Sequence, residues 1–254
     1  MRFSKYGLVA LFFLTPFNGV SAAELVVLSS IGVQEAMQDL ANKYEESSHH
    51  KVKLVFGTAS ALQRRISSGE NFDLAILTPA TLHVLTEQGK IVVGTETNIA
   101  RSGMGLAIRA GAPRKPIRNT AELTSALLSA RSIAYTRQGA SGEQFLKLLD
   151  RLRITDQVVP RLVDATPVGG KAGELVASGK AELAVQLINE VQSVKGIELL
   201  GPFPPEVQHY TVFAAAISRT AQDALAAKGL LYYLSSPEAK SAFKAHGQEP
   251  IPEK

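Results

Sequence analysis

Two hydrophobic periods alternate along the first part of the chain. The stretch 26–28 is a short apolar run, and apolar residues then recur over 33–44 at the spacing of one helical face. The stretch 51–56 alternates apolar and polar residues, and a second amphipathic helix follows near Leu62. A third run, 72–77, has the composition of a buried strand. The pattern predicts repeated strand–turn–helix units.

The rest of the chain continues this alternation with less regular spacing. We expect strands over 99–108, 132–135, 162–165, 182–187 and 210–217, and helices over 120–128, 145–152, 171–176, 221–234 and 236–243. Strands that alternate with helices are typical of parallel βαβ units. The predicted fold class is therefore α/β, built from mostly parallel sheets flanked by helices.

The length and two long extended segments predict two lobes. A chain of 254 residues allows two lobes of about a hundred residues each. The extended segments near 98–108 and 201–216 are candidate crossovers between them. We assign residues 23–98 plus 212–254 to lobe I and residues 99–211 to lobe II. Hinges are expected near 98–104 and 205–213.

The N-terminus has the pattern of a secretory signal peptide over residues 1–22. Arg2 and Lys5 precede an apolar run over 7–13, and the small residues Val20-Ser21-Ala22 form a cleavage site. The apolar run is too short to span a bilayer. We therefore expect an exported protein, located in the periplasm.

Charge and cysteine content exclude several function classes. Cleavage after Ala22 removes two basic residues and lowers the formal net charge from +4 to +2, so the basic balance does not indicate nucleic-acid binding. The chain has no cysteine, which excludes disulfides, thiolate catalysis and cysteine-ligated metals. The histidines lack metal-ligand spacing, so no metal site and no cofactor are predicted.

Polar turns follow four predicted strands, two in each lobe. They contain Ser29-Ser30, Thr58-Ala59-Ser60, the stretch 136–142 and the stretch 167–171. Each lies at the start of a predicted helix, where backbone N–H groups and hydroxyls either cap the helix or bind an anion. Parallel strands present such turns at one sheet edge, so we expect them to converge on one cleft. Strand register decides whether Ser29 or Ser30 faces that cleft.

No motif indicates an enzyme. The stretch 139–142 does not match the G-x-S-x-G nucleophile elbow, and 169–172 lacks the spacing of a phosphate-binding P-loop. The alternative is a periplasmic enzyme that uses Ser141 or Ser30 as its nucleophile, which would need a base within hydrogen-bond reach. A sensory or partner-binding module on the same fold is a second alternative.

The mature chain, from Leu25 to about Pro250, resembles the type II periplasmic solute-binding proteins, and most of all the molybdate-binding proteins of ABC transporters. The residues that carry the resemblance are 28–30 with 36–40, then 56–62, 72–76 and 235–239. The resemblance implies a two-lobed fold that closes around a small anion and delivers it to a membrane permease. It implies no catalysis, and we expect a monomer.

The resemblance also implies which residues bind the ligand. A serine of the first turn falls on Ser30, whereas a second serine falls on Ala59. Backbone groups of the lobe II turns fall near Ala140 and Gly169, and a tyrosine hydroxyl falls on Leu187. Two side-chain donors are therefore absent, which makes a small organic carboxylate at least as plausible a ligand as molybdate or tungstate.

Neighbouring polar residues could replace the absent donors. Gln186 could supply an amide, and Arg101 could supply a guanidinium for a carboxylate. The alternative for Arg101 is a solvent-exposed arginine or one that bridges the lobes. The predicted ligand-binding set is Ser29, Ser30, Thr58, Ala59, Ser60, Arg101, Ala140, Ser141, Gly142, Gly169 and Gln186.

Overall fold

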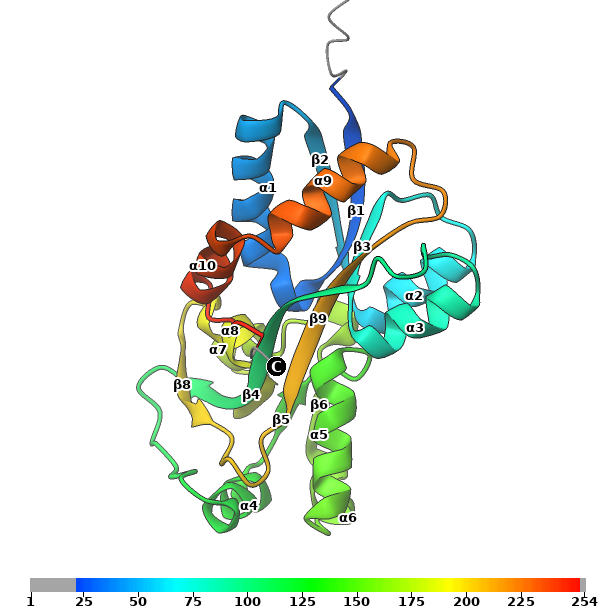
Figure 1. Cartoon of the computed structure of the whole chain (residues 1–254). Coiled ribbons are helices and arrows are strands. Elements are labelled where there is room, and N and C mark those ends of the chain that lie inside the picture. Colours follow the sequence, from blue (N-terminus) through cyan, green and yellow to red (C-terminus); the bar gives the residue numbers. More distant parts are fainter. Residues whose placement is uncertain (1–21, 252–254) are drawn as a thin grey trace, which may run out of the picture.

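The structure, a computed structural model, describes residues 22–251, so the predicted signal peptide lies outside the described residues except for Ala22. One curled sheet of nine strands runs through the described part of the chain (Figure 1). Its strand order is β2-β1-β3-β9-β4-β7-β5-β6, and β8 pairs with β4 outside this path. Helices flank the sheet, which confirms the α/β class.

The first half of the sheet contains three parallel strands. These are β1 (Glu24–Ser30), β2 (Lys51–Gly57) and β3 (Leu74–Leu77), with the helices α1 (Gln34–Ser48), α2 (Ala59–Ser67) and α3 (Pro79–Glu87). Because side chains alternate across a strand, Leu25 and Val27 of β1 pack into the core that contains α1, while Leu28 packs with α2 and α3. Both faces of the sheet are thus buried at β1, while the edge strand β2 stays partly exposed.

Two long strands connect the halves of the sheet. The strand β4 (Thr97–Arg109) pairs antiparallel with β9 (Tyr210–Ile217) through its first part. Through its second part it pairs antiparallel with β7 (Leu183–Leu187) and β8 (Ile197–Pro202). In Figure 1, β4 and β9 run side by side from one half of the molecule to the other. The two segments expected to be crossovers are therefore paired strands, and the lobe boundaries stay a prediction.

The second half repeats the parallel arrangement. Its strands are β5 (Ile133–Tyr135), β6 (Leu162–Asp164) and β7 (Leu183–Leu187), with the helices α4 (Thr120–Ser129), α5 (Ala140–Arg151), α6 (Thr155–Val158), α7 (Ala172–Ala177) and α8 (Ile188–Gln192). The sequence did not predict α6, α8 or β8. The helices α6 and α8 are too short to show a period, and Gly201-Pro202 made the end of β8 resemble a connection.

The C-terminal helices α9 (Ala224–Leu234) and α10 (Pro237–Ala245) return to the first half and pack against α1 (Figure 1). A buried carboxylate fixes the segment that leads to them. Asp73, 2% exposed, accepts hydrogen bonds from Val26 N and Gln222 N, both at 2.7 Å. This side chain connects β1 with the chain that follows β9.

The residues after α10 return to the centre of the molecule. The carbonyl of Gly32, in the first turn, accepts one hydrogen bond from Asn189 Nδ2 at 2.9 Å and another from Gln248 Nε2 at 3.1 Å. A Cβ atom on Gly32 would overlap Phe213, so this close approach requires glycine. The first turn is thus bonded both to α8 in the second half and to the C-terminal segment.

Candidate functional site

Polar turns from both halves enclose a small space, here called the inner cavity. Its volume is about 10 Å³, close to the room that one water molecule needs. It is lined by Ser30, Ile31, Gly32, Thr58, Ala59, Thr136, Gly139, Ala140, Ser141, Leu187, Glu190 and Phe213. The turns after β1, β2 and β5 meet here, together with the end of β7. Three of the four expected turns therefore converge, whereas the stretch 167–171 does not line the inner cavity.

Of the predicted ligand-binding set, Ser30, Thr58, Ala59, Ala140 and Ser141 line the inner cavity. Ser29 is fully buried outside the lining, where its hydroxyl donates to the Ser30 carbonyl at 3.4 Å. The Ser30 hydroxyl accepts from Gly32 N at 3.2 Å and thereby caps the short turn that follows. The structure thus places Ser30, and not Ser29, in the cavity wall.

Gln186 and the glycine pair lie behind the cavity wall. The amide of Gln186 donates to Gly170 O at 2.9 Å and accepts from Gly173 N at 3.3 Å, and Thr136 Oγ1 also donates to Gly170 O at 2.6 Å. Gly170 has a φ of +78°, and a Cβ atom there would lie 2.8 Å from the Ile31 side chain. Gly170, and not the exposed Gly169, thus approaches the first turn, while Gln186 holds the loop in place.

Gly142 and Arg101 are also outside the cavity lining. A Cβ atom on Gly142 would overlap the backbone carbonyl of Thr136, so glycine permits α5 to start close to β5. Arg101 Nη2 pairs with Glu249 Oε2 at 2.7 Å, and its guanidinium lies 4.2 Å from the centre of the Tyr210 ring. Arg101 therefore binds the C-terminal segment to the crossover strands.

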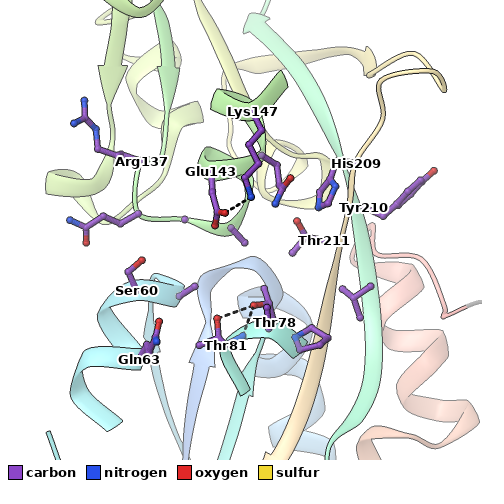
Figure 2. A pocket seen from close by; sticks show the side chains of 18 residues that line it. Ser60, Gln63, Thr78, Thr81, Arg137, Glu143, Lys147, His209, Tyr210 and Thr211 are labelled. Atoms are coloured by element: carbon purple, nitrogen blue, oxygen red, sulfur yellow. Dashed lines mark hydrogen bonds and ion pairs between the residues drawn. The ribbon is translucent and has the colours of Figure 1, made fainter. Parts of the chain in front are cut away.

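A larger space, here called the outer cleft, adjoins the inner cavity. It has a volume of about 600 Å³ and is lined by residues 59–60, Gln63, 78–81, 137–140, 143–144, Lys147 and 209–212. Figure 2 shows Glu143, Lys147 and His209 on one side of it, and Ser60, Gln63, Thr78 and Thr81 on the other. Ser60, the remaining member of the predicted set, lines this cleft and not the inner cavity.

Sequence reasoning missed the charged side of the outer cleft. Lys147 Nζ pairs with Glu143 Oε1 at 2.6 Å across one turn of α5. The one available signal was that both residues lie on the helix that starts at a predicted ligand-binding turn. Burial, followed by the charge of Lys147, lowers the pKa of His209, so this imidazole is neutral at pH 7. The cleft thus offers an ammonium group and a neutral imidazole.

Within residues 22–251 no cluster of histidine, aspartate and glutamate could hold a metal ion. The helices of that same part of the chain include none that is long and apolar enough to cross a bilayer.

The sequence model of the bacterial extracellular solute-binding proteins matches residues 25–249, nearly the whole described chain. The chain belongs to this family. Among its relatives, an aconitate isomerase from a Pseudomonas species is 29% identical over 236 residues, which cover 90% of this chain and 88% of the relative. The molybdate-binding protein ModA of Azotobacter vinelandii is 26% identical over 231 residues, which cover 89% of this chain and 90% of the relative.

A solved structure supports the same fold for this solute-binding protein. The periplasmic molybdate-binding protein of Azotobacter vinelandii superposes with a TM-score of 0.76 at 20% identity, covering 90% of this chain and 100% of that one. This likeness confirms the two-lobed periplasmic binding protein fold that the sequence predicted. Membership of a bacterial extracellular family also agrees with an exported protein.

In this solute-binding protein, apolar groups occupy part of the wall around the inner cavity. Leu187, at the position where the resemblance implies a tyrosine hydroxyl, is 2% exposed and faces the cavity together with Phe213. Ala59 stands in the wall where a second serine was implied. The inner cavity therefore has fewer side-chain donors than the resemblance alone would give it.

A carboxylate that the sequence analysis did not select also lines the inner cavity. Glu190 Oε2 accepts a hydrogen bond from Leu187 N at 3.3 Å, at the start of α8. Burial raises the pKa of Glu190 to about 7. Its position directly after a buried strand was the one available signal, because such positions lie at the ligand-binding edge of a parallel sheet. At neutral pH the protonated and ionised forms of this carboxyl group are therefore both populated.

Proposed function

We propose that this protein captures a small organic carboxylate between its two lobes and delivers it to the membrane permease of an ABC transporter in the periplasm. The observation that carries the proposal is the composition of the inner cavity. Leu187 and Ala59 supply no hydroxyl, and Glu190 adds a carboxyl group to the wall. A tetrahedral dianion needs donors on every side, and an ionised Glu190 repels its two charges more strongly than the single charge of one carboxylate group, which also needs fewer donors.

The relatives are compatible with either kind of anion. One bears the name aconitate isomerase and is 29% identical, and another is named as molybdate-binding and is 26% identical. Identities this similar do not separate the two ligand classes, so the choice depends on the cavity. The departures at Leu187 and Ala59 favour the carboxylate.

In the proposed complex, the hydroxyls of Ser30 and Ser141 donate to the ligand carboxylate. Gly139, the residue before α5, has no side chain that could cap this twelve-residue helix. The first backbone N–H groups of α5, including that of Ala140, therefore donate to the same anion. The lobes are residues 23–98 plus 212–254 and residues 99–211. Bending within the hinges near 98–104 and 205–213 would open the cleft for ligand entry.

Isothermal titration calorimetry of the mature protein is expected to show binding of carboxylates and no tight binding of molybdate or tungstate. Ser141→Ala should weaken carboxylate binding about 5- to 100-fold, because one hydrogen bond to a charged group is lost. Ser67→Ala, which removes an exposed hydroxyl on α2 outside both cavities, is the control and should change affinity less than about twofold. Tight molybdate binding without any carboxylate response would refute the proposal.

A second candidate function is isomerisation of an unsaturated carboxylate, favoured by the position of Glu190. A general base works best when its pKa is close to the ambient pH, and the raised pKa of Glu190, about 7, meets that condition inside the ligand cavity. Ionised Glu190 would remove a proton from a carbon next to the double bond. Return of the proton at the other end of the allylic system moves the double bond, with no net change in atoms or electrons.

Proton NMR in D2O tests this second function with cis- and trans-aconitate as probes. An isomerase interconverts them and introduces deuterium, and Glu190→Gln should slow that exchange by a factor of about 100 or more while calorimetric affinity stays similar. Glu174→Gln, on α7 and outside both cavities, should leave the rate unchanged. A protein that binds aconitate without any exchange is a binding protein only.

A further inference from the structure

The outer cleft has room for a larger molecule than the single carboxylate group that the inner cavity would bind. Its volume of about 600 Å³ compares with about 10 Å³ for the inner cavity, and Ala59, Gly139 and Ala140 line both spaces. The two spaces therefore adjoin at the starts of α2 and α5. Because the inner cavity has room for about one water molecule, a carboxylate group would enter it when the proposed hinges open, and the rest of its molecule would extend into the outer cleft.

Three helices begin at the wall of the outer cleft. They are α2 at Ala59, α3 at Pro79 and α5 at Ala140, each at least nine residues long. Thr58 and Thr78 cap the first two through their side chains, whereas α5 has no side-chain cap. The partial positive charges of three helix starts add to the field inside the cleft and favour a second anionic group.

A buried hydroxyl without a partner supplies independent support for a ligand. Thr211 is 3% exposed, and its Oγ1 has no hydrogen-bond partner among the described residues. Figure 2 shows the Thr211 side chain in the cleft, between the side that carries Lys147 and the side that carries Thr78. Buried polar atoms are nearly always hydrogen-bonded in folded proteins, so this hydroxyl is free to bond an oxygen atom of a ligand or of a water.

Lys147 is the cation that can reach such a ligand. Its bond to Glu143 at 2.6 Å joins two side chains that are 62% and 66% exposed, an arrangement that contributes little to stability and is readily exchanged for another anion. Arg137 is a poorer candidate, because its Nε donates to the Tyr135 hydroxyl at 3.0 Å and Figure 2 shows its side chain directed away from the cleft.

We infer that the outer cleft is a second anion subsite, in which Lys147 and the Thr211 hydroxyl bind a further carboxylate of a di- or tricarboxylate whose first carboxylate occupies the inner cavity. This inference rests on the proposed function and extends it, since it names polycarboxylates as the substrate class. Lys147 and Thr211 then determine selectivity for polycarboxylates over monocarboxylates.

Calorimetry with propane-1,2,3-tricarboxylate and with butyrate tests the subsite. The wild-type protein should bind the tricarboxylate at least about tenfold more tightly than butyrate, because a charge-assisted hydrogen bond is added. Lys147→Gln should reduce tricarboxylate affinity by about tenfold or more and leave butyrate affinity within about twofold. Thr211→Val should have the same selective effect without lowering the melting temperature, because the native hydroxyl has no protein partner.

The matched control is Lys43→Gln. Lys43 forms the same kind of exposed pair, with Asp39 at 3.1 Å across one turn of α1, but outside both cavities. Lys43→Gln should change neither the tricarboxylate affinity nor the butyrate affinity. Equal binding of the two probes by the wild type, or equal losses for both probes in Lys147→Gln, would refute the second subsite and leave carboxylate capture intact. Binding of neither probe, together with tight molybdate binding, would overturn the proposed function and the subsite with it.

Discussion

Asp73→Ala is expected to lower the free energy of unfolding by about 4 kcal/mol. The native carboxylate accepts from two backbone N–H groups, those of Val26 and Gln222, in a setting where it is 2% exposed. A buried donor that loses its partner costs about 1–3 kcal/mol, and this substitution strands two of them and leaves a cavity. Urea unfolding followed by circular dichroism measures the change.

Two further variants test whether the loss of stability comes from the two hydrogen bonds of Asp73. Asp73→Asn keeps one acceptor oxygen but points an NH2 group at the other backbone donor, so its loss of stability should be intermediate. Asp150→Ala removes an exposed aspartate at the end of α5 and should cost less than about 1 kcal/mol. A loss below about 1 kcal/mol in Asp73→Ala would show that the two N–H groups find other partners.

Glu190 is expected to make the protein less stable as pH rises from about 4 to about 8. Its pKa is raised from 4.5 to about 7 in the folded protein, so below pH 4.5 the carboxyl group is protonated in both the folded and the unfolded state and contributes nothing. Above pH 4.5 the unfolded chain loses this proton first, which favours unfolding until the pH passes 7. A shift of this size corresponds to about 3 kcal/mol.

Unfolding free energies of the wild type and of Glu190→Gln over this pH range test the expectation. Other carboxylates titrate equally in both proteins, so the difference between the two curves isolates Glu190. The wild type should lose about 3 kcal/mol relative to the variant between pH 4 and pH 8. Parallel curves would mean that the folded protein solvates this carboxylate as well as the unfolded chain does.

The fold was largely predictable because the strongest signals lay in long, regular elements. The period of α1 and the alternation in β2 are visible in the sequence, and both elements lie where they were expected. The pairing of β4 with β9 could not be predicted, since antiparallel register between strands about a hundred residues apart depends on the whole sheet. The short helix α8 was missed for a related reason: five residues are too few to show a helical period.

The sequence predicted the part of the site that is formed by turns at the ends of strands, and no more. Ser30 reaches the inner cavity as the last residue of β1, and Ala140 and Ser141 reach it at the start of the helix that follows β5. Arg101 and Gln186 were selected for their chemistry, but a partner elsewhere in the chain already occupies each of them. Thr211 and Glu190 have little sequence signal, because the unbonded hydroxyl of the one and the raised pKa of the other arise from packing.

The hydrogen bond from Asn189 to the Gly32 carbonyl has a consequence for affinity. It joins α8 in the second half to the first turn through protein groups alone, so it contributes to closure whatever occupies the cleft. Under the proposed hinge motion, this bond would raise the fraction of molecules that are closed before capture, and apparent affinity scales with that fraction. The proposed capture would then be tightened by a bond that does not touch the ligand, and two solutes that fit the cleft differently would gain affinity by the same factor.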